Sequence, residues 1–329
     1  MSTNLESIYL TLEEAIQALP YPDQPGLLYD PVKYTLADPG KRIRSKLTLL
    51  GAILTGGDPH KALPAAIAIE LLHNFTLIHD DIMDNADTRR GKMTVYRKWG
   101  VPTAILSGDI LFGMSYQQLN VYAEKGWLTG TEFVALLSTF QQAVTAVCEG
   151  QAMDIEFEGN DVVPLPTYIE MISKKTAALL SAALELGGIT SKASLEMRSH
   201  LHAMGTAAGI AFQIQDDLMD VVADPSSFGK KVGGDIREGK KTWLMIRALE
   251  SADEPDATML KQICTSKSAD DIQINQVIRL YENLGILQDA QKEIERYYSE
   301  AMNHLQFFNN ASHYDYTRTF FDALLNRSS

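Results

Sequence analysis

The chain has little cysteine: two residues in 329, Cys148 and Cys264, far apart in the sequence. Two distant thiols predict neither a disulfide framework nor a cysteine-based metal site, and a reducing cytoplasm is the expected location. A basic leader is also missing, because the first twenty residues hold three glutamates and no lysine or arginine. That charge is the wrong sign for a signal or transit peptide.

Positive charge is scarce along the whole chain. Twenty-nine lysines and arginines face 42 acidic residues, which gives a net charge of −13. Nucleic-acid-binding proteins and polybasic membrane anchors need clustered cations, so both classes are disfavoured. No apolar run approaches the roughly 20 residues of a membrane span, so no transmembrane segment is expected. The 45% hydrophobic content is ordinary for a globular chain with a sizeable core.

Alternating strand patterns of useful length are absent, whereas apolar residues recur at helical spacing almost throughout. One expected helix covers "KRIRSKLTLLGAIL", and the others cover 63–84, 103–124, 131–153, 167–187, 196–222, 240–250, 269–284, 287–305 and 314–326. The first of these, 63–84, is apolar nearly all round and is expected to be buried. Segments 21–40 and 223–241 are expected to be loops. Without a linker or a regular repeat, the sequence predicts one all-α domain over 1–329.

Against this background, the chain carries two copies of one acidic motif, in "FTLIHDDIMD" and "AFQIQDDLMD". Their aspartates lie within about one helical turn and near a helix C-terminus, where the helix dipole is also negative. Such crowding calls for a cation. Carboxylates suit Mg²⁺, which keeps waters and accepts phosphate oxygens. Two facing clusters would therefore clamp a diphosphate through Mg²⁺. A solvated acidic face is the alternative, and the apolar flanks of both copies disfavour it.

Basic residues accompany these motifs. Arg89 and Arg90 follow the first motif closely, and guanidinium groups bind phosphate oxygens in a bidentate manner. Further cations occur at a helix start in "GKRIR", in "SKKTAALL" and in the loop "FGKKVGGDIREGKKT". Singly, each is more often a solvated charge. In an acidic protein their position beside the acidic motifs favours anion binding.

These segments resemble the trans-isoprenyl diphosphate synthases (polyprenyl synthetases), which include farnesyl and geranylgeranyl diphosphate synthases. The resemblance covers roughly 35–325 and also includes "GDILF", "GQAMDIEF" and "FQIQDDLMDVVADPSSFGKKVGGDIREGKKTWL", in the family's order. It implies the isoprenoid synthase fold, a bundle of mostly antiparallel helices around a deep central cavity. It also implies a homodimer, with 1–35 as a peripheral N-terminal segment of the single domain.

The resemblance also implies roles for individual residues. The Mg²⁺ ligands, for three ions with the diphosphate bound, are Asp80, Asp81, Asp84, Asp216, Asp217 and Asp220. The contacts to the allylic diphosphate are Arg89, Lys175, Lys230 and Lys240. The site for isopentenyl diphosphate comprises Lys41, Arg44, His73 and Arg90. Thr176 and Gln213 line the reacting carbons, and supporting positions are Gln151, Asp154 and Asp235. Because "GKKVGGD" is one residue longer than in many relatives, Lys230 and Lys231 are both candidates for the phosphate contact.

The implied reaction is a 1'-4 head-to-tail condensation. Mg²⁺ and cationic side chains neutralise the leaving diphosphate of dimethylallyl, geranyl or farnesyl diphosphate. The double bond of isopentenyl diphosphate then attacks the allylic cation, and a proton is lost to the departing diphosphate. No nucleophilic side chain is required, but the apolar cavity must exclude water.

Product length depends on the residues just before the first motif. Phe75 lies five positions before Asp80, about one helical turn above the reaction site, and should act as a floor for the growing chain. Thr76 is smaller and leaves room, so C15 to C20 products are expected, with C20 preferred to C15. The alternative is that Phe75 only packs in the core. Deeper positions such as Ile69, Leu72 or 105–120 could override it.

Three other functions compete with this one. A class I terpene cyclase shares the first acidic motif but needs no second substrate site, so "GKRIR", Arg90 and the second motif disfavour it. An HD-type phosphohydrolase is suggested by His73, His79 and Asp80, but it would need further histidine ligands. A non-catalytic subunit of a heteromeric synthase would be expected to lose acidic-motif residues, and both motifs are complete.

Overall fold

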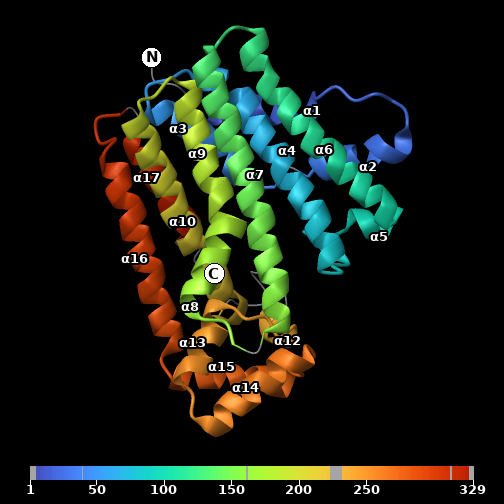
Figure 1. The fold of residues 1–329 in the computed structure, drawn as a ribbon, viewed down its shortest axis with the longest axis vertical. Helices are drawn as coiled ribbons and strands as arrows, with labels where there is room; N and C mark the ends of the chain where they lie inside the picture. The colour runs from blue at the N-terminus through green and yellow to red at the C-terminus, as the bar shows by residue number, and fades with distance from the viewer. Residues whose placement is uncertain (1–4, 39, 161, 223–231, 312, 326–329) are drawn as a thin grey trace. The chain divides into compact units, whose positions relative to one another are not determined.

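The computed structural model describes residues 5–38, 40–160, 162–222, 232–311 and 313–325, and most of them are helical (Figure 1). The predicted all-α class is therefore confirmed. Contacts group the chain into two compact units. Unit 1 comprises Met1–Val144, Ala182–His202 and Asn310–Tyr314; unit 2 comprises Thr145–Ser181, Ala203–Asn309 and Asp315–Ser329.

Unit 1 holds the N-terminal helices. Its elements are α1 (Leu5–Gln17), α2 (Gly26–Leu36), α3 (Ile43–Leu54), α4 (Pro59–Met83), β1 (Thr88–Arg89), β2 (Lys92–Met93), α5 (Val95–Trp99), α6 (Val101–Glu124) and parts of α7 (Gly130–Gly159), α9 (Ala178–Thr190) and α10 (Leu195–Val222). Among the described residues the only sheet is the antiparallel pair β1–β2, in which Arg89 lies opposite Lys92.

Unit 2 holds the remaining parts of those long helices and the C-terminal elements. These elements are α8 (Leu165–Ile172), the π-helical turn η1 (Ser173–Ala177), α12 (Gly234–Arg237), α13 (Trp243–Ser251), α14 (Glu254–Ser266), α15 (Asp271–Asn283), α16 (Ile286–Gln306) and α17 (Tyr314–Leu325). Helices α13, α14 and α15 pack together (Figure 1).

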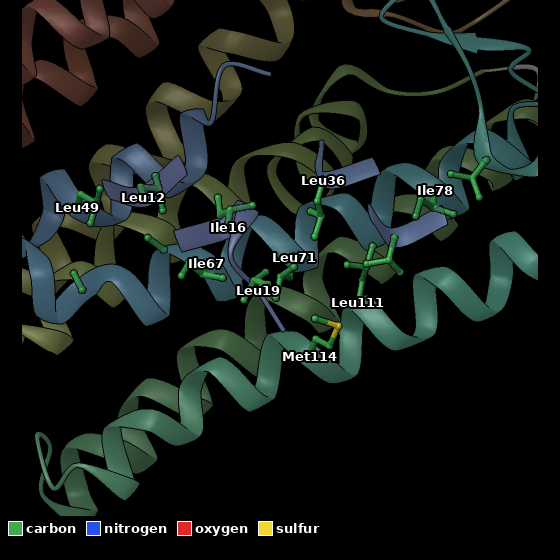
Figure 2. Close-up of a cluster of buried hydrophobic side chains, with 14 of the residues drawn as sticks. Leu12, Ile16, Leu19, Leu36, Leu49, Ile67, Leu71, Ile78, Leu111 and Met114 are labelled. Atoms are coloured by element: carbon green, nitrogen blue, oxygen red, sulfur yellow. The ribbon is translucent and has the colours of Figure 1, made fainter. Parts of the chain in front are cut away.

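The hydrophobic core of unit 1 forms around α4, which lies side by side with α6 (Figure 1). Figure 2 shows its side chains, contributed by five helices: Leu12, Ile16, Leu36, Leu49, Ile67, Leu71, Ile78, Leu111 and Met114. Leu12 and Ile16 of α1 are each 1% exposed, so the N-terminal helix contributes fully to this core. Burial of these side chains from water is the main stabilising contribution.

Helix α4 is long and apolar enough to cross a membrane by length and composition alone. Its apolar run is interrupted in the sequence by Glu70, which lies buried in an ion pair with Arg42. In the most apolar window of α4, 61% of the residues are buried inside the protein. A core helix passes the same test of length and hydropathy.

Several expected loops are helical. The segment 21–40 contains α2, which starts directly after Pro25 and has Pro31 inside it. Prolines signalled a loop, but the burial of Val32 and Leu36 compensates for the backbone hydrogen bond that an internal proline removes. The predicted loop 223–241 contains α12; residues 223–231 lie outside the described part of the chain.

Three more helices, α1, α5 and α14, were not predicted. The acidic stretch at 253–256 is compatible with a turn by composition, yet the Asp253 side chain accepts a hydrogen bond from the Asp256 amide and caps α14, whose first turn contains Pro255. A capping aspartate followed by proline is a helix-start signal as well as a turn signal. The expected helix 167–187 is also interrupted, because η1 separates α8 from α9.

Candidate active site

The first acidic motif lies at the end of α4. Asp80 and Asp81 belong to its last turn, and Asp84 is the C-cap, with its amide donating to the Asp80 carbonyl at 2.8 Å. Asp84 is exposed, Asp80 is half-buried and Asp81 is 4% exposed. The Arg89 Nε donates to Asp81 Oδ1 at 2.8 Å. Burial raises the pKa of the Asp81 carboxyl, and the Arg89 guanidinium opposes that rise.

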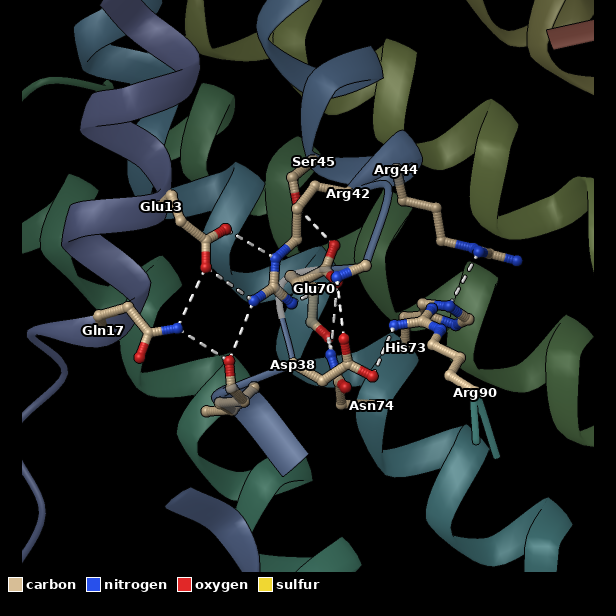
Figure 3. Close-up of polar contacts among 12 residues, drawn as sticks. Glu13, Gln17, Asp38, Arg42, Arg44, Ser45, Glu70, His73, Asn74 and Arg90 are labelled. Carbon is tan, nitrogen blue, oxygen red and sulfur yellow. Dashed lines mark hydrogen bonds and ion pairs between the residues drawn. The ribbon is translucent and has the colours of Figure 1, made fainter. Parts of the chain in front are cut away.

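A second cationic group lies beside this motif, in unit 1. Arg44 Nη1 is 3.0 Å from His73 Nε2 (Figure 3). Burial, with Arg44 and Arg90 adding to it, lowers the pKa of His73 well below its usual value, so the ring is neutral and accepts this hydrogen bond. Burial also lowers the pKa of Arg44, to about 10, while Glu70 opposes the change. Arg44 therefore stays charged at neutral pH.

The Arg90 side chain is held by the segment just before α3. Its Nη1 lies 3.6 Å from Asp38 Oδ2. Gly40 has a φ of 51°, and a Cβ added there would lie 2.3 Å from Arg90 Nη1. A side chain at Gly40 would therefore displace the guanidinium as well as strain the backbone. The arrangement directs Arg44, His73 and Arg90 to one region (Figure 3).

A pocket lies next to these residues. Its space not filled by atoms, open solvent included, is about 460 Å³. It is lined by Tyr34, Thr35, Asp38, Asn74, Leu77, Ile78, Asp81, Arg89, Arg90, Lys92, Met93, Thr94 and Val95. Both arginines of the double-arginine pair thus line one pocket of unit 1, together with an aspartate of the first acidic motif.

The second acidic motif lies near the end of α10, in unit 2. Asp216 is exposed, and Asp217 is 4% exposed. The Asp217 carboxylate accepts three hydrogen bonds: from the Tyr168 hydroxyl, from the Trp243 amide at 3.0 Å and from Gln213 Nε2 at 3.1 Å. Burial raises the pKa of Asp217 to about 6, against the effect of these donors. Its hydrogen-bond partners are uncharged.

Asp220 connects the motif to the segment that follows it. Its Oδ2 accepts from the Asp235 amide at 3.1 Å. Burial raises the pKa of Asp235 to about 7, and Asp220 adds to the rise. Lys240 lies 3.7 Å from Asp235 Oδ1, so this predicted phosphate contact is close to the acidic group. Lys230 and Lys231, the alternative candidates, lie outside the described residues.

The π-helical turn η1 presents two more predicted residues. Thr176 Oγ1 donates to Gln213 Oε1 at 2.8 Å, and Lys175 Nζ pairs with Asp154. The neighbouring Lys174 pairs instead with Glu149 and Glu170. A Cβ on Gly150 of α7 would lie 2.2 Å from the Lys175 amide nitrogen, so glycine permits this close approach.

The donor chemistry fits Mg²⁺. Within the described ranges, no group of three or more His, Cys, Asp or Glu side chains is arranged to hold a metal ion. Mg²⁺ does not need such a cage, since it binds through one or two carboxylates and completes its shell with water and substrate phosphate. Each motif has one exposed carboxylate, Asp84 in the first and Asp216 in the second, beside partly exposed ones. These residues are suited to hold Mg²⁺ against a diphosphate.

The predicted site residues thus form two groups. The group in unit 1 comprises Lys41, Arg44, His73, Phe75, Thr76, Asp80, Asp81, Asp84, Arg89 and Arg90; the group in unit 2 comprises Gln151, Asp154, Lys175, Thr176, Gln213, Asp216, Asp217, Asp220, Asp235 and Lys240. Sequence reasoning missed the partners that hold them, Asp38, Tyr168 and Trp243, and the buried Glu70, whose charge acts on Arg44. Only Glu70 carried a signal, as a lone acid in an apolar helix, which needs a buried partner.

Comparisons with known proteins show the family to which the chain belongs. The sequence profile of the polyprenyl synthetase family matches residues 25–281. The chain belongs to that family, and the predicted class of enzyme, a prenyltransferase, is confirmed.

Among individual relatives, the chain is 43% identical to the short chain isoprenyl diphosphate synthase of Methanocaldococcus jannaschii, over 79% of this chain and 78% of that one. It is 45% identical to the geranylgeranyl diphosphate synthase of Saccharolobus solfataricus, over 70% and 69%. The crystal structure of geranylgeranyl pyrophosphate synthetase from Pyrococcus horikoshii matches with a TM-score of 0.90 and 35% identity, over 98% and 99%. The predicted isoprenoid synthase fold is confirmed by this likeness.

Proposed function

We propose that this enzyme condenses isopentenyl diphosphate with an allylic diphosphate in an Mg²⁺-dependent, 1'-4 head-to-tail reaction and releases an all-trans C15 to C20 prenyl diphosphate, geranylgeranyl diphosphate in preference to farnesyl diphosphate. The observation that carries the proposal is the pair of distinct cationic groups beside the first acidic motif. Arg89 contacts Asp81 directly, whereas Arg44 and His73 form a separate group. Two diphosphate substrates require two such groups.

The two diphosphate substrates bind to different residues. Arg89, Lys175 and Lys240 bind the allylic diphosphate, with Lys230 or Lys231 as a further contact. Lys41, Arg44, His73 and Arg90 bind isopentenyl diphosphate. Bound Mg²⁺ would supply neutralisation of the charge that develops on the leaving diphosphate. Thr176 and Gln213 flank the reacting carbons, and the hydrogen bond between them fixes the orientation of the Gln213 amide. The departing diphosphate takes the proton.

The C20 preference rests on Phe75. Its half-buried ring lies 4.7 Å from the His79 ring and 5.3 Å from the Phe112 ring, centroid to centroid. Phe112 continues this aromatic row to Tyr116. Because Phe112 and Tyr116 pack in a row beside it, the Phe75 ring would be held in place and would limit the space available to a long prenyl chain. Relatives named geranylgeranyl and geranylfarnesyl diphosphate synthases support a product near this length.

Thr76 leaves room beside this floor. Its hydroxyl donates to the His73 carbonyl at 2.8 Å, within the helix itself. Threonine is a small residue, so this position presents no second aromatic ring to a growing chain. We further propose that the enzyme is a cytoplasmic homodimer and that 1–329 form one domain with 1–35 at its periphery.

The test is chromatography of the products formed from Mg²⁺, radiolabelled isopentenyl diphosphate and each of dimethylallyl, geranyl and farnesyl diphosphate. The expected result is label in a C15 to C20 diphosphate, mostly C20, and loss of label incorporation with EDTA. Absence of condensation with every primer overturns the proposal. A terpene cyclase would release hydrocarbon without incorporating label.

A further inference from the structure

Arg42 is the most completely engaged cation near the isopentenyl diphosphate group, although it is not one of the phosphate contacts. It is 6% exposed. Its Nε and Nη2 donate to both oxygens of Glu13 at 3.0 and 3.2 Å, and its Nη1 donates to Glu70 Oε1 at 3.0 Å. Nη2 also donates to the Leu36 carbonyl at 3.1 Å. The guanidinium fork is thus bound on all sides by protein atoms (Figure 3).

The partners of Arg42 come from three helices. Glu13 belongs to α1, Leu36 ends α2 and Glu70 lies in the middle of α4. Arg42 itself is the N-cap residue of α3. One side chain therefore joins four helices of unit 1. A charged group buried so deeply persists only when its hydrogen-bonding capacity is satisfied, so its position is strongly determined.

The partners are themselves fixed. Ser45 Oγ donates to Glu70 Oε2 at 2.6 Å, and Asn74 Nδ2 donates to the Glu70 backbone carbonyl at 2.7 Å. Gln17 Nε2 bridges Glu13 Oε1 and the Leu36 carbonyl, at 3.1 and 3.0 Å. Burial alone would raise the pKa of Glu13, but the hydrogen bonds from Arg42 and Gln17 outweigh it and lower that pKa. Glu13 is therefore a carboxylate at neutral pH.

The backbone conformation at Arg42 requires the contacts that its side chain makes. Its φ is 49°, in the left-handed region, and Gly40 two residues earlier has a φ of 51°. A left-handed conformation is unfavourable for arginine and persists only where surrounding contacts impose it. Lys41 lies between these two residues, and Arg44 follows in the first turn of α3. The direction of both cations depends on a turn that Arg42 holds in place.

We propose that Arg42 is a positioning residue for isopentenyl diphosphate. Clamped between Glu13 and Glu70, it fixes the turn 40–44 so that Lys41 and Arg44 point at the diphosphate of that substrate. Helix α1 is thereby part of the support of the substrate site. This inference rests on the proposed function, and it adds a residue pair, Arg42 and Glu13, that does not itself touch the substrate.

The experiment compares the full-length wild-type enzyme with Glu13→Gln and Arg42→Lys. Glu13→Gln keeps the shape of the side chain but removes its charge, and Arg42→Lys keeps the charge but loses the planar fork. The matched control is Glu14→Gln, the same change at the next residue of α1, where the side chain is exposed. For each protein, KM is measured for isopentenyl diphosphate and for the allylic diphosphate, each with the other substrate saturating.

Glu13→Gln and Arg42→Lys should each raise the KM for isopentenyl diphosphate about tenfold, which corresponds to about 1.4 kcal/mol of binding free energy. The KM for the allylic diphosphate should change less than about twofold, because Arg89 and Lys175 do not depend on this turn. Glu14→Gln should match the wild type. Equal rises in both KM values, or no rise for isopentenyl diphosphate in either variant, would overturn the proposal.

Calorimetric binding of isopentenyl diphosphate to the same proteins gives a readout that does not require turnover. Wild-type enzyme that binds this substrate without condensing it contradicts the proposed function but not the positioning role. Variants that bind it as tightly as the wild type contradict the positioning role but not the function. If Glu13→Gln does not fold, Gln17→Ala at the exposed edge of the network should still weaken binding, by about twofold. Unchanged binding in that variant would count against the proposal.

Discussion

The two acidic motifs bury their middle aspartate to the same depth but compensate its charge differently. Asp81 and Asp217 are each 4% exposed. Asp81 is paired with a cation, Arg89, whose side chain is 38% exposed. Asp217 is held by three uncharged donors, two of which, Tyr168 and the Trp243 amide, are buried.

The difference indicates different duties for two motifs of the same spacing. A half-exposed guanidinium can turn from Asp81 to a substrate phosphate while water still solvates it. Buried neutral donors cannot leave Asp217 without losing their only partner. Under the proposed function, the first motif would therefore combine metal binding with a phosphate contact, whereas the middle aspartate of the second motif is held by the scaffold of unit 2. Four experiments test how far this comparison holds.

The largest effect is expected where the motifs should behave alike. Asp80→Ala and Asp216→Ala should each lower turnover by roughly 10²–10³-fold, because each removes stabilisation of the leaving diphosphate. Label incorporation measures turnover, and circular dichroism checks that the helices remain. Asp23→Ala, at an exposed position outside both motifs, is the control and should be fully active. Near-normal turnover in either motif variant would disprove a shared metal-binding role.

The next effect concerns the residue five positions before each motif. Phe75 precedes Asp80, whereas the small, buried Ala211 precedes Asp216. Only the first motif has a side chain there large enough to limit the product. Phe75→Ala should therefore shift the products by one or more isoprene units beyond C20, as seen by chromatography. Phe75→Tyr keeps the ring and should keep the wild-type distribution. A product distribution in Phe75→Ala equal to that of the wild type would disprove the floor.

The two motifs should differ most clearly in how much their middle aspartate contributes to the free energy of unfolding. Asp217→Ala leaves the Tyr168 hydroxyl and the Trp243 amide without their acceptor, at about 1–3 kcal/mol for each buried donor. Asp81→Ala frees only Arg89, whose exposed side chain regains water, and should cost less than about 1 kcal/mol. Urea unfolding of both variants measures the difference in the free energy of unfolding. Equal losses would show that the two aspartates are held alike.

The smallest effect comes from removing a single donor. Tyr168→Phe deletes one of the three hydrogen bonds to Asp217 and should lower the free energy of unfolding by about 1 kcal/mol. The other two donors remain, so turnover should stay close to that of the wild type. Tyr116→Phe, the same change at a tyrosine that is only partly buried and lies outside both motifs, serves as the control. A loss of activity as large as that of Asp216→Ala would mean that Tyr168 acts in the reaction itself.

Long apolar periodicity and the two motifs were enough to predict the all-α fold and the position of the acidic groups. Two of the three partners of Asp217 were not predictable, because Tyr168 and Trp243 lie 49 and 26 positions away and one of them contributes only a backbone amide. Helix α2 was missed for a different reason. Its prolines are local loop signals, whereas the burial of Val32 and Leu36 that outweighs them arises only in the folded chain.

The π-helical turn at Ser173–Ala177 changes the register of side chains between α8 and α9. A π turn contains one residue more than an α turn, so the face on which a side chain lies changes across it. In this turn Lys174 pairs with Glu149 and Lys175 pairs with Asp154. Thr176 donates a hydrogen bond to Gln213. Deleting one residue here would restore a regular helix and rotate every later side chain of α9 by about 100° relative to α8. The spacing of 3.6 residues per turn that assigns side chains to a helix face in α8 therefore does not assign them in α9.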